Sequence, residues 1–123
     1  MKVYSIIESA SHPKLSDIYQ RLGYEEQVFA TMRKAIQSLK SIRPGLVVAD
    51  FLYGYGNNYA GVNISNLDVF IYSLQKYAPE AKVIALYEKS ERSYITQFQK
   101  LFPSVICMEL PIVRPEFIKH IQK

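Results

Sequence analysis

Residues 38–50, SLKSIRPGLVVAD, decide the fold class of this chain. The first half is the end of a helical stretch that Pro44 stops, and residues 46–49 are a short apolar run. The run is apolar at every position rather than at alternate positions, as is typical of a strand covered by helices on both faces. Asp50 follows directly. We therefore predict a buried parallel strand with a carboxylate at its carboxyl end.

Similar apolar runs occur on both sides of this stretch and alternate with longer segments that have helical spacing. The predicted strands are residues 3–7, 27–29, 46–49, 83–87 and 105–108, and the predicted helices are residues 15–22, 32–39, 67–74, 94–101 and a segment from Pro115 onward. This order predicts a (βα)5 α/β fold, a doubly wound three-layer sandwich with a five-stranded parallel sheet, in which residues 1–123 form one domain.

The composition excludes several classes of protein. The chain has 123 residues, 49% of them hydrophobic and 21% charged, which predicts a globular core and a cytoplasmic protein without a signal peptide or membrane span. The only cysteine, Cys107, lies in an apolar run, which excludes an internal disulfide and favours buried packing. The net charge is +4, but the 15 Lys and Arg residues are scattered, so no nucleic-acid partner is expected.

Functional residues of open parallel sheets gather at the carboxyl ends of the strands. In this chain those ends carry Glu8, Asp50, Tyr87 and Glu109. The loop at residues 53–63 is unusually long and rich in Gly, Asn and Tyr. It is either a surface loop or a binding loop, because its tyrosines offer flat contact surfaces with polar tips.

The helix, proline, apolar strand and aspartate of residues 38–50 resemble the same elements of response-regulator receiver domains. Residues 1–8, MKVYSIIE, resemble the first strand of that family with its acidic end, and residues 79–86 resemble its fourth strand. Leu110-Pro111 is similar to the Lys-Pro step that closes the fifth strand. The resemblance covers essentially the whole chain and implies a CheY-like, flavodoxin-like sheet in the order 2-1-3-4-5.

The resemblance also implies roles for three residues. Asp50 is the candidate phosphoacceptor, and Glu8, Asp50 and the backbone carbonyl of Leu52 are candidate Mg²⁺ ligands. A hard cation with oxygen ligands offsets the charge when a carboxylate attacks an anionic phosphoryl group. Mg²⁺ is therefore expected only if the chain can be phosphorylated, and otherwise no cofactor is expected.

Three departures from the family pattern predict a degenerate receiver, or pseudo-receiver. Ile7 stands in place of a second acid, Tyr87 in place of a Ser or Thr, and Leu110 in place of the lysine. An apolar side chain cannot bind a phosphoryl oxygen, so the cation that would hold the phosphorylated state is missing.

The candidate residues also have purely structural interpretations. Asp50 would accept hydrogen bonds from the backbone of the loop that follows it, and Glu8 would be a solvated turn residue. We expect His12 to be exposed near Pro13 and His120 to lie in the last turn of the final helix. Neither histidine is predicted to bind a metal or to take part in catalysis.

Three functions remain open. The first is a stand-alone degenerate receiver, not an enzyme, that acts in phosphorelay-related signal transduction as an adaptor for a kinase, a phosphotransfer protein or an output protein. The second is an active phosphoacceptor that takes a phosphoryl group on Asp50. The third is a flavodoxin-like module in which Tyr53, Tyr55 or Tyr59 stacks on a flavin or nucleotide.

The resemblance also implies a partner-binding face, and a homodimer through this face is equally open. Receivers bind partners with the fourth helix, fifth strand and fifth helix. Here those elements carry Lys89, Arg92, Tyr94, Lys100, Arg114 and Lys119.

Overall fold

The computed structural model describes residues 1–54 and 65–122. The strands are β1 (Lys2–Ile6), β2 (Glu25–Phe29), β3 (Leu46–Asp50), β4 (Lys82–Tyr87) and β5 (Ile106–Glu109). The helices are α1 (Ser16–Arg21), α2 (Met32–Ser38), α3 (Asp68–Tyr77), α4 (Arg92–Leu101), which follows the 3₁₀ turn η1 (Lys89–Glu91), and α5 (Arg114–Ile121). Each predicted strand and helix is present, which confirms the alternating β/α order.

The five strands form one parallel sheet in the order β2-β1-β3-β4-β5. β3 lies at the centre, where Val47 pairs with Tyr4 of β1 and with Val83 of β4. All five of its residues are buried. The predicted fold class and strand order are therefore confirmed.

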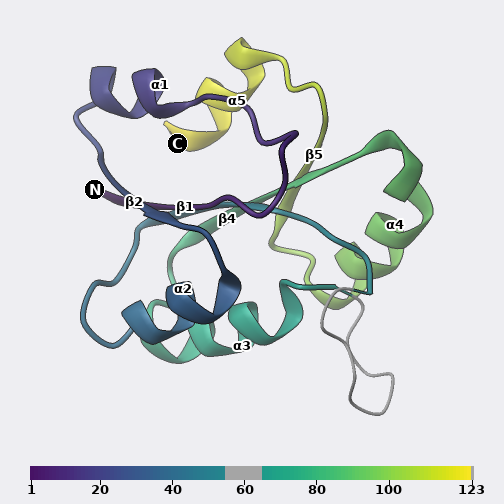
Figure 1. The fold of residues 1–123 in the computed structure, drawn as a ribbon, viewed down its shortest axis with the longest axis horizontal. Coiled ribbons are helices and arrows are strands. Elements are labelled where there is room, and N and C mark those ends of the chain that lie inside the picture. The colour runs from purple at the N-terminus through teal and green to yellow at the C-terminus, as the bar shows by residue number, and fades with distance from the viewer. Residues whose placement is uncertain (55–64, 123) are drawn as a thin grey trace.

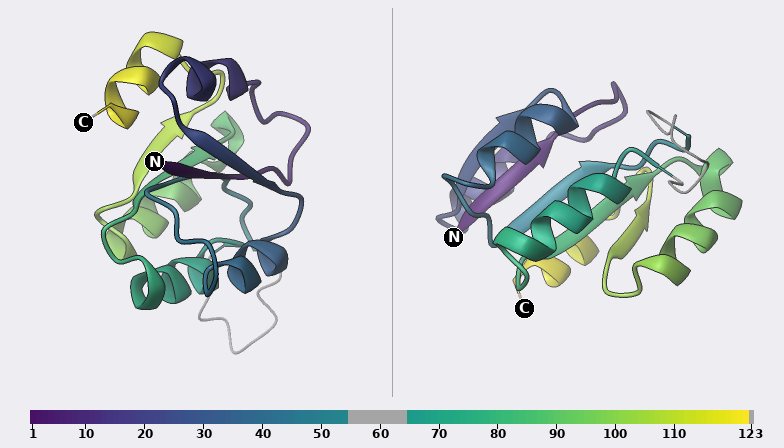
Figure 2. Two further views of the ribbon diagram at one scale, coloured as in Figure 1. Left: turned by 90° about the vertical axis from the view of Figure 1, so that its left-hand side faces the viewer. Right: turned by 90° about the horizontal axis from the view of Figure 1, so that it is seen from below.

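Helices cover both faces of the sheet, with α1 and α5 on one face and α2, α3 and α4 on the other (Figures 1 and 2). Successive side chains of β1 alternate between these layers, as the strand geometry requires. Val3 packs with α1 and α5, whereas Tyr4 and Ile6 pack with the three helices of the opposite face. This double coverage explains why the strands are apolar at almost every position.

Local signals in the sequence determine several helix ends. The Thr31 hydroxyl accepts a hydrogen bond from Lys34 N and caps α2, and Pro115 occupies the first turn of α5. Gly23 has a φ of +74°, the left-handed conformation that ends the turn after α1. Within residues 1–54 and 65–122, no helix has the length and apolar character to cross a membrane.

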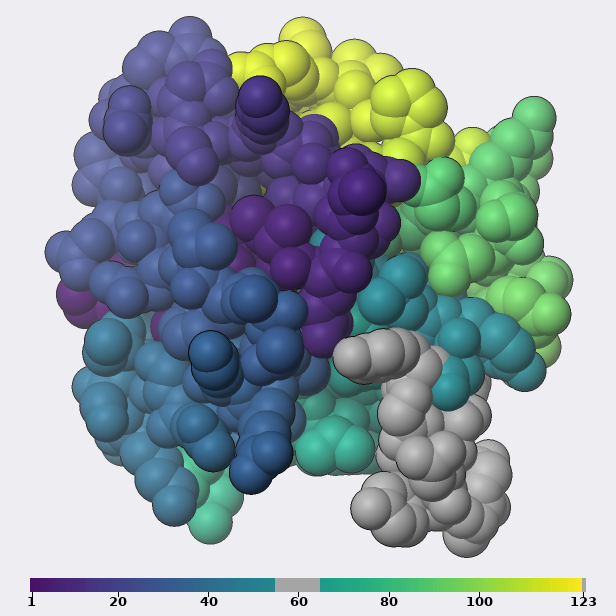
Figure 3. Space-filling model, in the orientation of Figure 1, coloured from purple at the N-terminus to yellow at the C-terminus, as the bar shows by residue number. Residues whose placement is uncertain are grey.

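Because the strands are parallel, the loops that follow β1, β3, β4 and β5 meet at one edge of the sheet. Figure 3 shows the loop after β1 in the middle of one face of the molecule, between α2 and α4. The predicted loop at residues 53–63 lies largely outside the described residues, and Tyr55 and Tyr59 fall in that part.

Candidate functional site

The candidate site is centred on the carboxylate of Asp50, at the end of β3. The residue is 2% exposed, and its Oδ2 accepts hydrogen bonds from the backbone N–H groups of Glu8, at 2.9 Å, and Ser9, at 3.0 Å. Asp50 is therefore bound by backbone donors, as its structural interpretation predicts, but they come from the loop after β1 rather than from the loop after β3. The carboxylate joins the ends of two neighbouring strands.

The other carboxylate oxygen of Asp50 faces a histidine. Nδ1 of His12 lies 2.8 Å from Asp50 Oδ1, and the side chain of His12 is 3% exposed. The prediction that His12 is exposed is therefore wrong. The backbone turns after β1, where His12 N donates to Ser9 O and Ser11 N donates to the Ser9 hydroxyl, and this turn directs the imidazole inward.

Asn66 is a site residue that the sequence analysis missed. Its side-chain Nδ2 donates to Glu8 Oε1 and to the Asp50 carbonyl, both at 2.8 Å, and its Oδ1 accepts from Leu52 N at 2.9 Å. Its backbone N–H also donates to the Leu52 carbonyl, at 3.2 Å. One amide side chain therefore connects the loops after β1 and β3.

A local signal could have drawn attention to this segment. Ser65 and Asp68 are three residues apart, immediately before the apolar face of α3, in the pattern of a helix start. The Asp68 carboxylate accepts from both the backbone and the hydroxyl of Ser65, at 2.9 and 2.8 Å. This hydrogen-bonded turn precedes α3 and places Asn66 between the two strand ends.

Both carboxylate oxygens of Glu8 accept hydrogen bonds from groups of the protein. Oε2 accepts from Met32 N, the first residue of α2, at 3.2 Å, while Oε1 accepts from Asn66. Glu8 is half-buried rather than solvated. Its negative charge also lies at the N-terminal end of α2, where a carboxylate is stabilised.

The three predicted Mg²⁺ ligands lie around the same strand ends, but they do not fit a cation site in this arrangement. Both carboxylate oxygens of Asp50, both of Glu8 and the carbonyl of Leu52 already contact donors of the protein. Mg²⁺ requires an open, near-octahedral set of oxygen ligands. Residues 1–54 and 65–122 contain no group of three or more His, Cys, Asp or Glu side chains that could hold a metal ion. Magnesium binding stays a prediction.

The ends of β4 and β5 do not direct a cation at Asp50. Leu110 packs with the apolar cluster beneath α1 and α5, and its backbone N–H donates to Tyr87 O at 2.8 Å. Tyr87 is half-buried, and burial together with the nearby Glu109 carboxylate raises the pKa of its hydroxyl. The Arg92 guanidinium is paired with Glu109 at 2.6 and 2.8 Å, and it holds the pKa of that carboxyl below its ordinary value.

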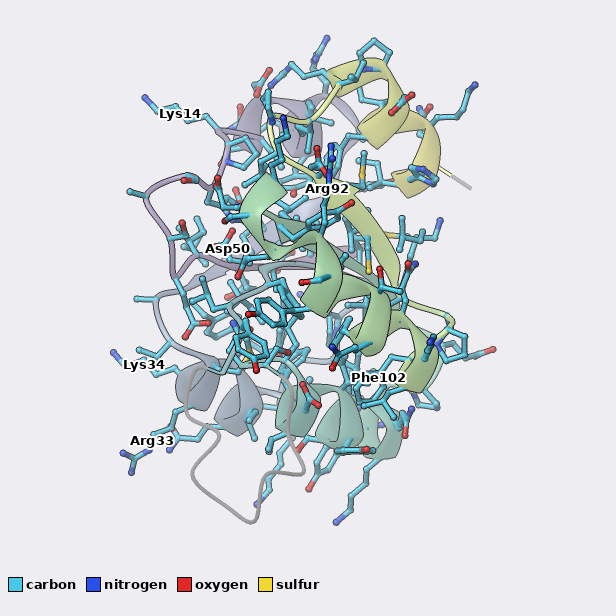
Figure 4. All side chains as sticks on the ribbon, turned by 90° about the vertical axis from the view of Figure 1, so that its right-hand side faces the viewer. Lys14, Arg33, Lys34, Asp50, Arg92 and Phe102 are labelled. Carbon is cyan, nitrogen blue, oxygen red and sulfur yellow. The ribbon has the colours of Figure 1, made fainter. Side chains whose placement is uncertain are left out.

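Other basic side chains lie away from the site. Figure 4 shows Lys14, Arg33 and Lys34 at the periphery of the molecule, pointing away from Asp50. Among the described residues, His12 alone lies within ion-pair distance of Asp50. The imidazole is therefore the basic side chain in contact with the Asp50 carboxylate.

Tyr53 bears on the flavin or nucleotide hypothesis. Its ring stacks on that of Tyr94 with centroids 3.5 Å apart and planes at 13°, and its backbone N–H donates to Glu91. One face of the ring is therefore already covered by α4. The other two tyrosines of that hypothesis lie outside the described residues.

No protein-family model matches the chain, and no curated protein matches its sequence. Its fold is similar to solved receiver structures. The chemotaxis protein CheY4 of Vibrio cholerae aligns with a TM-score of 0.69 and 18% identity over 98% of this chain and 95% of that chain. The receiver domain of NtrC4 from Aquifex aeolicus aligns with a TM-score of 0.68 and 20% identity over 98% and 93%.

A third solved structure with a similar fold carries the name of an enzyme rather than of a receiver. It is an adenylate cyclase from Rhodopirellula baltica, with a TM-score of 0.69 and 12% identity over 98% of this chain and 84% of that chain. The structural neighbours are mostly CheY-like receivers, so the predicted resemblance is confirmed at the level of the fold. Because one fold hosts many functions, the function must be argued from the side chains at the site.

Proposed function

We propose that this chain is a receiver-like domain of a signal-transduction system that acts as a protein-interaction adaptor and is not switched by phosphorylation of Asp50. The receiver fold supports the signalling role. The contact between His12 and Asp50 carries the rest of the proposal, because it fills one side of the carboxylate with a protein side chain.

Phosphoryl transfer depends almost entirely on positioning and on charge stabilisation. An attacking Asp50 would first have to lose its hydrogen bonds with His12 or with the backbone of Glu8 and Ser9. The ends of β4 and β5 carry Tyr87 and Leu110 where the receiver resemblance implies a small hydroxyl and a lysine, and the side chain of Leu110 packs into the apolar cluster beneath α1 and α5. These features favour a locked carboxylate over a phosphoacceptor.

The proposed adaptor binds a signalling protein, such as a kinase, a phosphotransfer protein or an output protein, through α4, β5 and α5. Arg92 and Arg114 are already paired with Glu109 and Asp17 on this side of the molecule. Lys89, Lys100 and Lys119 are exposed there. A partner with an acidic surface would be attracted to these lysines, and a homodimer through the same face is the alternative.

Intact-mass measurement after incubation with Mg²⁺ and acetyl phosphate tests the proposal. The expected result is no added phosphoryl mass on the unmodified chain or on the Asp50→Asn control. A CheY-like receiver with the usual lysine and hydroxyl is run in parallel to show that the donor works. A stable adduct that disappears in Asp50→Asn would overturn the proposal.

The second candidate function is that of an active phosphoacceptor. Asp50 favours it by its position at the end of β3, within hydrogen-bond distance of the loop after β1. His12→Ala separates the two functions, because it removes the imidazole and keeps the carboxylate. If His12 blocks the site, only this variant should gain phosphoryl mass, whereas an active receiver would gain it without the substitution.

A further inference from the structure

A cavity of about 410 Å³ lies at the carboxyl edge of the sheet, between the loops that follow β1, β4 and β5. Its walls include Ser11, Pro13 and Lys14 from the first loop, and Leu110 and Ile112 from the third. It is distinct from the Asp50 site, but the loop that forms one wall also carries His12. Cavities of this size, with apolar walls and few polar groups, are the usual form of small-ligand sites.

The cavity combines an apolar floor with basic side chains at its rim. Leu15 is buried, and Leu110 and Ile112 pack into the apolar cluster beneath α1 and α5, so these three side chains form a fixed surface. Lys14 and Arg114 also line the cavity. The Arg114 guanidinium is held by the Lys14 carbonyl at 3.1 Å and by Asp17 at 2.6 Å, so it is ordered before any ligand arrives.

The charges determine the kind of ligand. Glu88 is the acidic side chain of the lining, but it accepts a hydrogen bond from the backbone of Glu91 in the capping box of η1. Asp17 neutralises part of the charge of Arg114. Lys14 is exposed and makes no ion pair with any described residue. Lys14 is therefore the basic side chain of the lining that has no acidic partner among the described residues.

We propose that this cavity binds a small organic carboxylate with a short apolar body, whose carboxylate meets Lys14 and Arg114 and whose apolar part lies on Leu110 and Ile112. The loop after β1 carries His12, which contacts Asp50, and also forms one wall of this cavity. A bound carboxylate would hold that loop against the edge of the sheet, with His12 in place.

NMR titration of the ¹⁵N-labelled protein with 4-methylpentanoate tests this proposal at constant ionic strength. The expected result is a saturable change in the amide shifts of Lys14, Leu15, Leu110 and Ile112, with smaller changes at His12. The amine with the same skeleton, 4-methylpentylammonium, is the comparison ligand. No saturation with the carboxylate, or equal saturation with the amine, would overturn the proposal.

Matched variants distinguish a specific site from attraction to a basic protein. Lys14→Gln should weaken binding about three- to ten-fold, as expected for a partly exposed charge-assisted contact. Lys34→Gln removes an exposed lysine from α2, far from the cavity, and should leave binding unchanged. Ile112→Phe narrows the cavity without a change of charge and should also weaken binding, with folding checked by circular dichroism. Equal effects of Lys14→Gln and Lys34→Gln would contradict the assignment.

Discussion

The imidazole Nδ1 of His12 lies 2.8 Å from Oδ1 of Asp50, although the two residues are 38 positions apart in the chain. Both side chains are almost fully buried, at 3% and 2% exposure. The Asp50 carboxylate is thereby satisfied entirely by the protein, through one imidazole and two backbone N–H groups. This saturation supports the proposal that Asp50 has a structural role, because buried polar groups are normally hydrogen-bonded.

We expect His12→Ala to lower the free energy of unfolding by about 1–3 kcal/mol, because it leaves Asp50 Oδ1 buried without its partner. Urea unfolding at neutral pH measures the loss. His120→Ala is the control, since that residue lies in the last turn of α5, where the sequence predicted it, and its side chain makes no contact with Asp50. Equal stability of the two variants would show that the contact contributes nothing.

Asn66→Ala should be destabilising by about 1–3 kcal/mol, because three buried or half-buried polar groups lose a partner. These groups are Glu8 Oε1, the Asp50 carbonyl and Leu52 N. Asn66→Asp should lower the stability more than Asn66→Ala, since it adds a negative charge beside the Glu8 carboxylate and the Asp50 carbonyl. Gln97→Ala, at an exposed position of α4, serves as the control in the same urea titrations. A smaller loss of unfolding free energy in Asn66→Asp than in Asn66→Ala would contradict this placement of the Asn66 amide.

Two buried tyrosines provide a matched test of hydrogen bonding. The Tyr4 hydroxyl donates to the Ser38 hydroxyl at 2.9 Å and contacts the Ile42 carbonyl, and Tyr4→Phe should cost about 1 kcal/mol. The Tyr19 hydroxyl is buried near the Ser5 hydroxyl but makes no hydrogen bond of normal geometry with a described residue, and Ser5 donates to Glu26.

Tyr19→Phe should therefore leave the free energy of unfolding unchanged or raise it. Both residues are at most 1% exposed, so the comparison separates the hydroxyl from burial of the ring. Thermal and urea unfolding of the two variants measure the difference. A larger loss of unfolding free energy for Tyr19→Phe than for Tyr4→Phe would refute the prediction.

Acid should weaken the ion pairs of Glu25 with Lys2 and of Glu109 with Arg92. Hydrogen bonding to the basic partner lowers the pKa of both carboxyls below the ordinary value of 4.5. A carboxyl with a lowered folded-state pKa adds stability above its unfolded-state pKa and loses it as the pH falls through the folded-state pKa.

Stability should therefore decrease as the pH falls below about 4.5, in the range where unfolded-state carboxyls titrate. Arg92→Ala should reduce the difference in unfolding free energy between pH 7 and pH 3, whereas Arg33→Ala, an exposed control on α2, should not. Both pairs are exposed, so the change is expected to be small and to decrease further with added salt. If the unfolding free energy of Arg92→Ala depends on pH as it does in the unmodified chain, the ion pair of Glu109 with Arg92 is not the source of this dependence.

The amino-acid sequence by itself determined the α/β class, the number of strands, the positions of the helices and the place of Asp50 at a strand end. These features depend on local periodicity, on proline and glycine signals and on runs of apolar residues, all of which act within a few residues. Ile7, Tyr87 and Leu110 likewise led to the prediction, through the resemblance to receivers, that the usual phosphoryl contacts are missing.

Only the tertiary structure decided how the Asp50 carboxylate is satisfied. The hydrogen-bond partners come from Glu8, Ser9 and His12, and Asn66 reaches Glu8 across 58 positions of sequence. Nothing local marks these residues as partners, because their proximity results from the parallel pairing of β1 with β3. His12 therefore looked like an exposed loop residue in the sequence, although its burial follows from the folding of its loop over the end of the sheet.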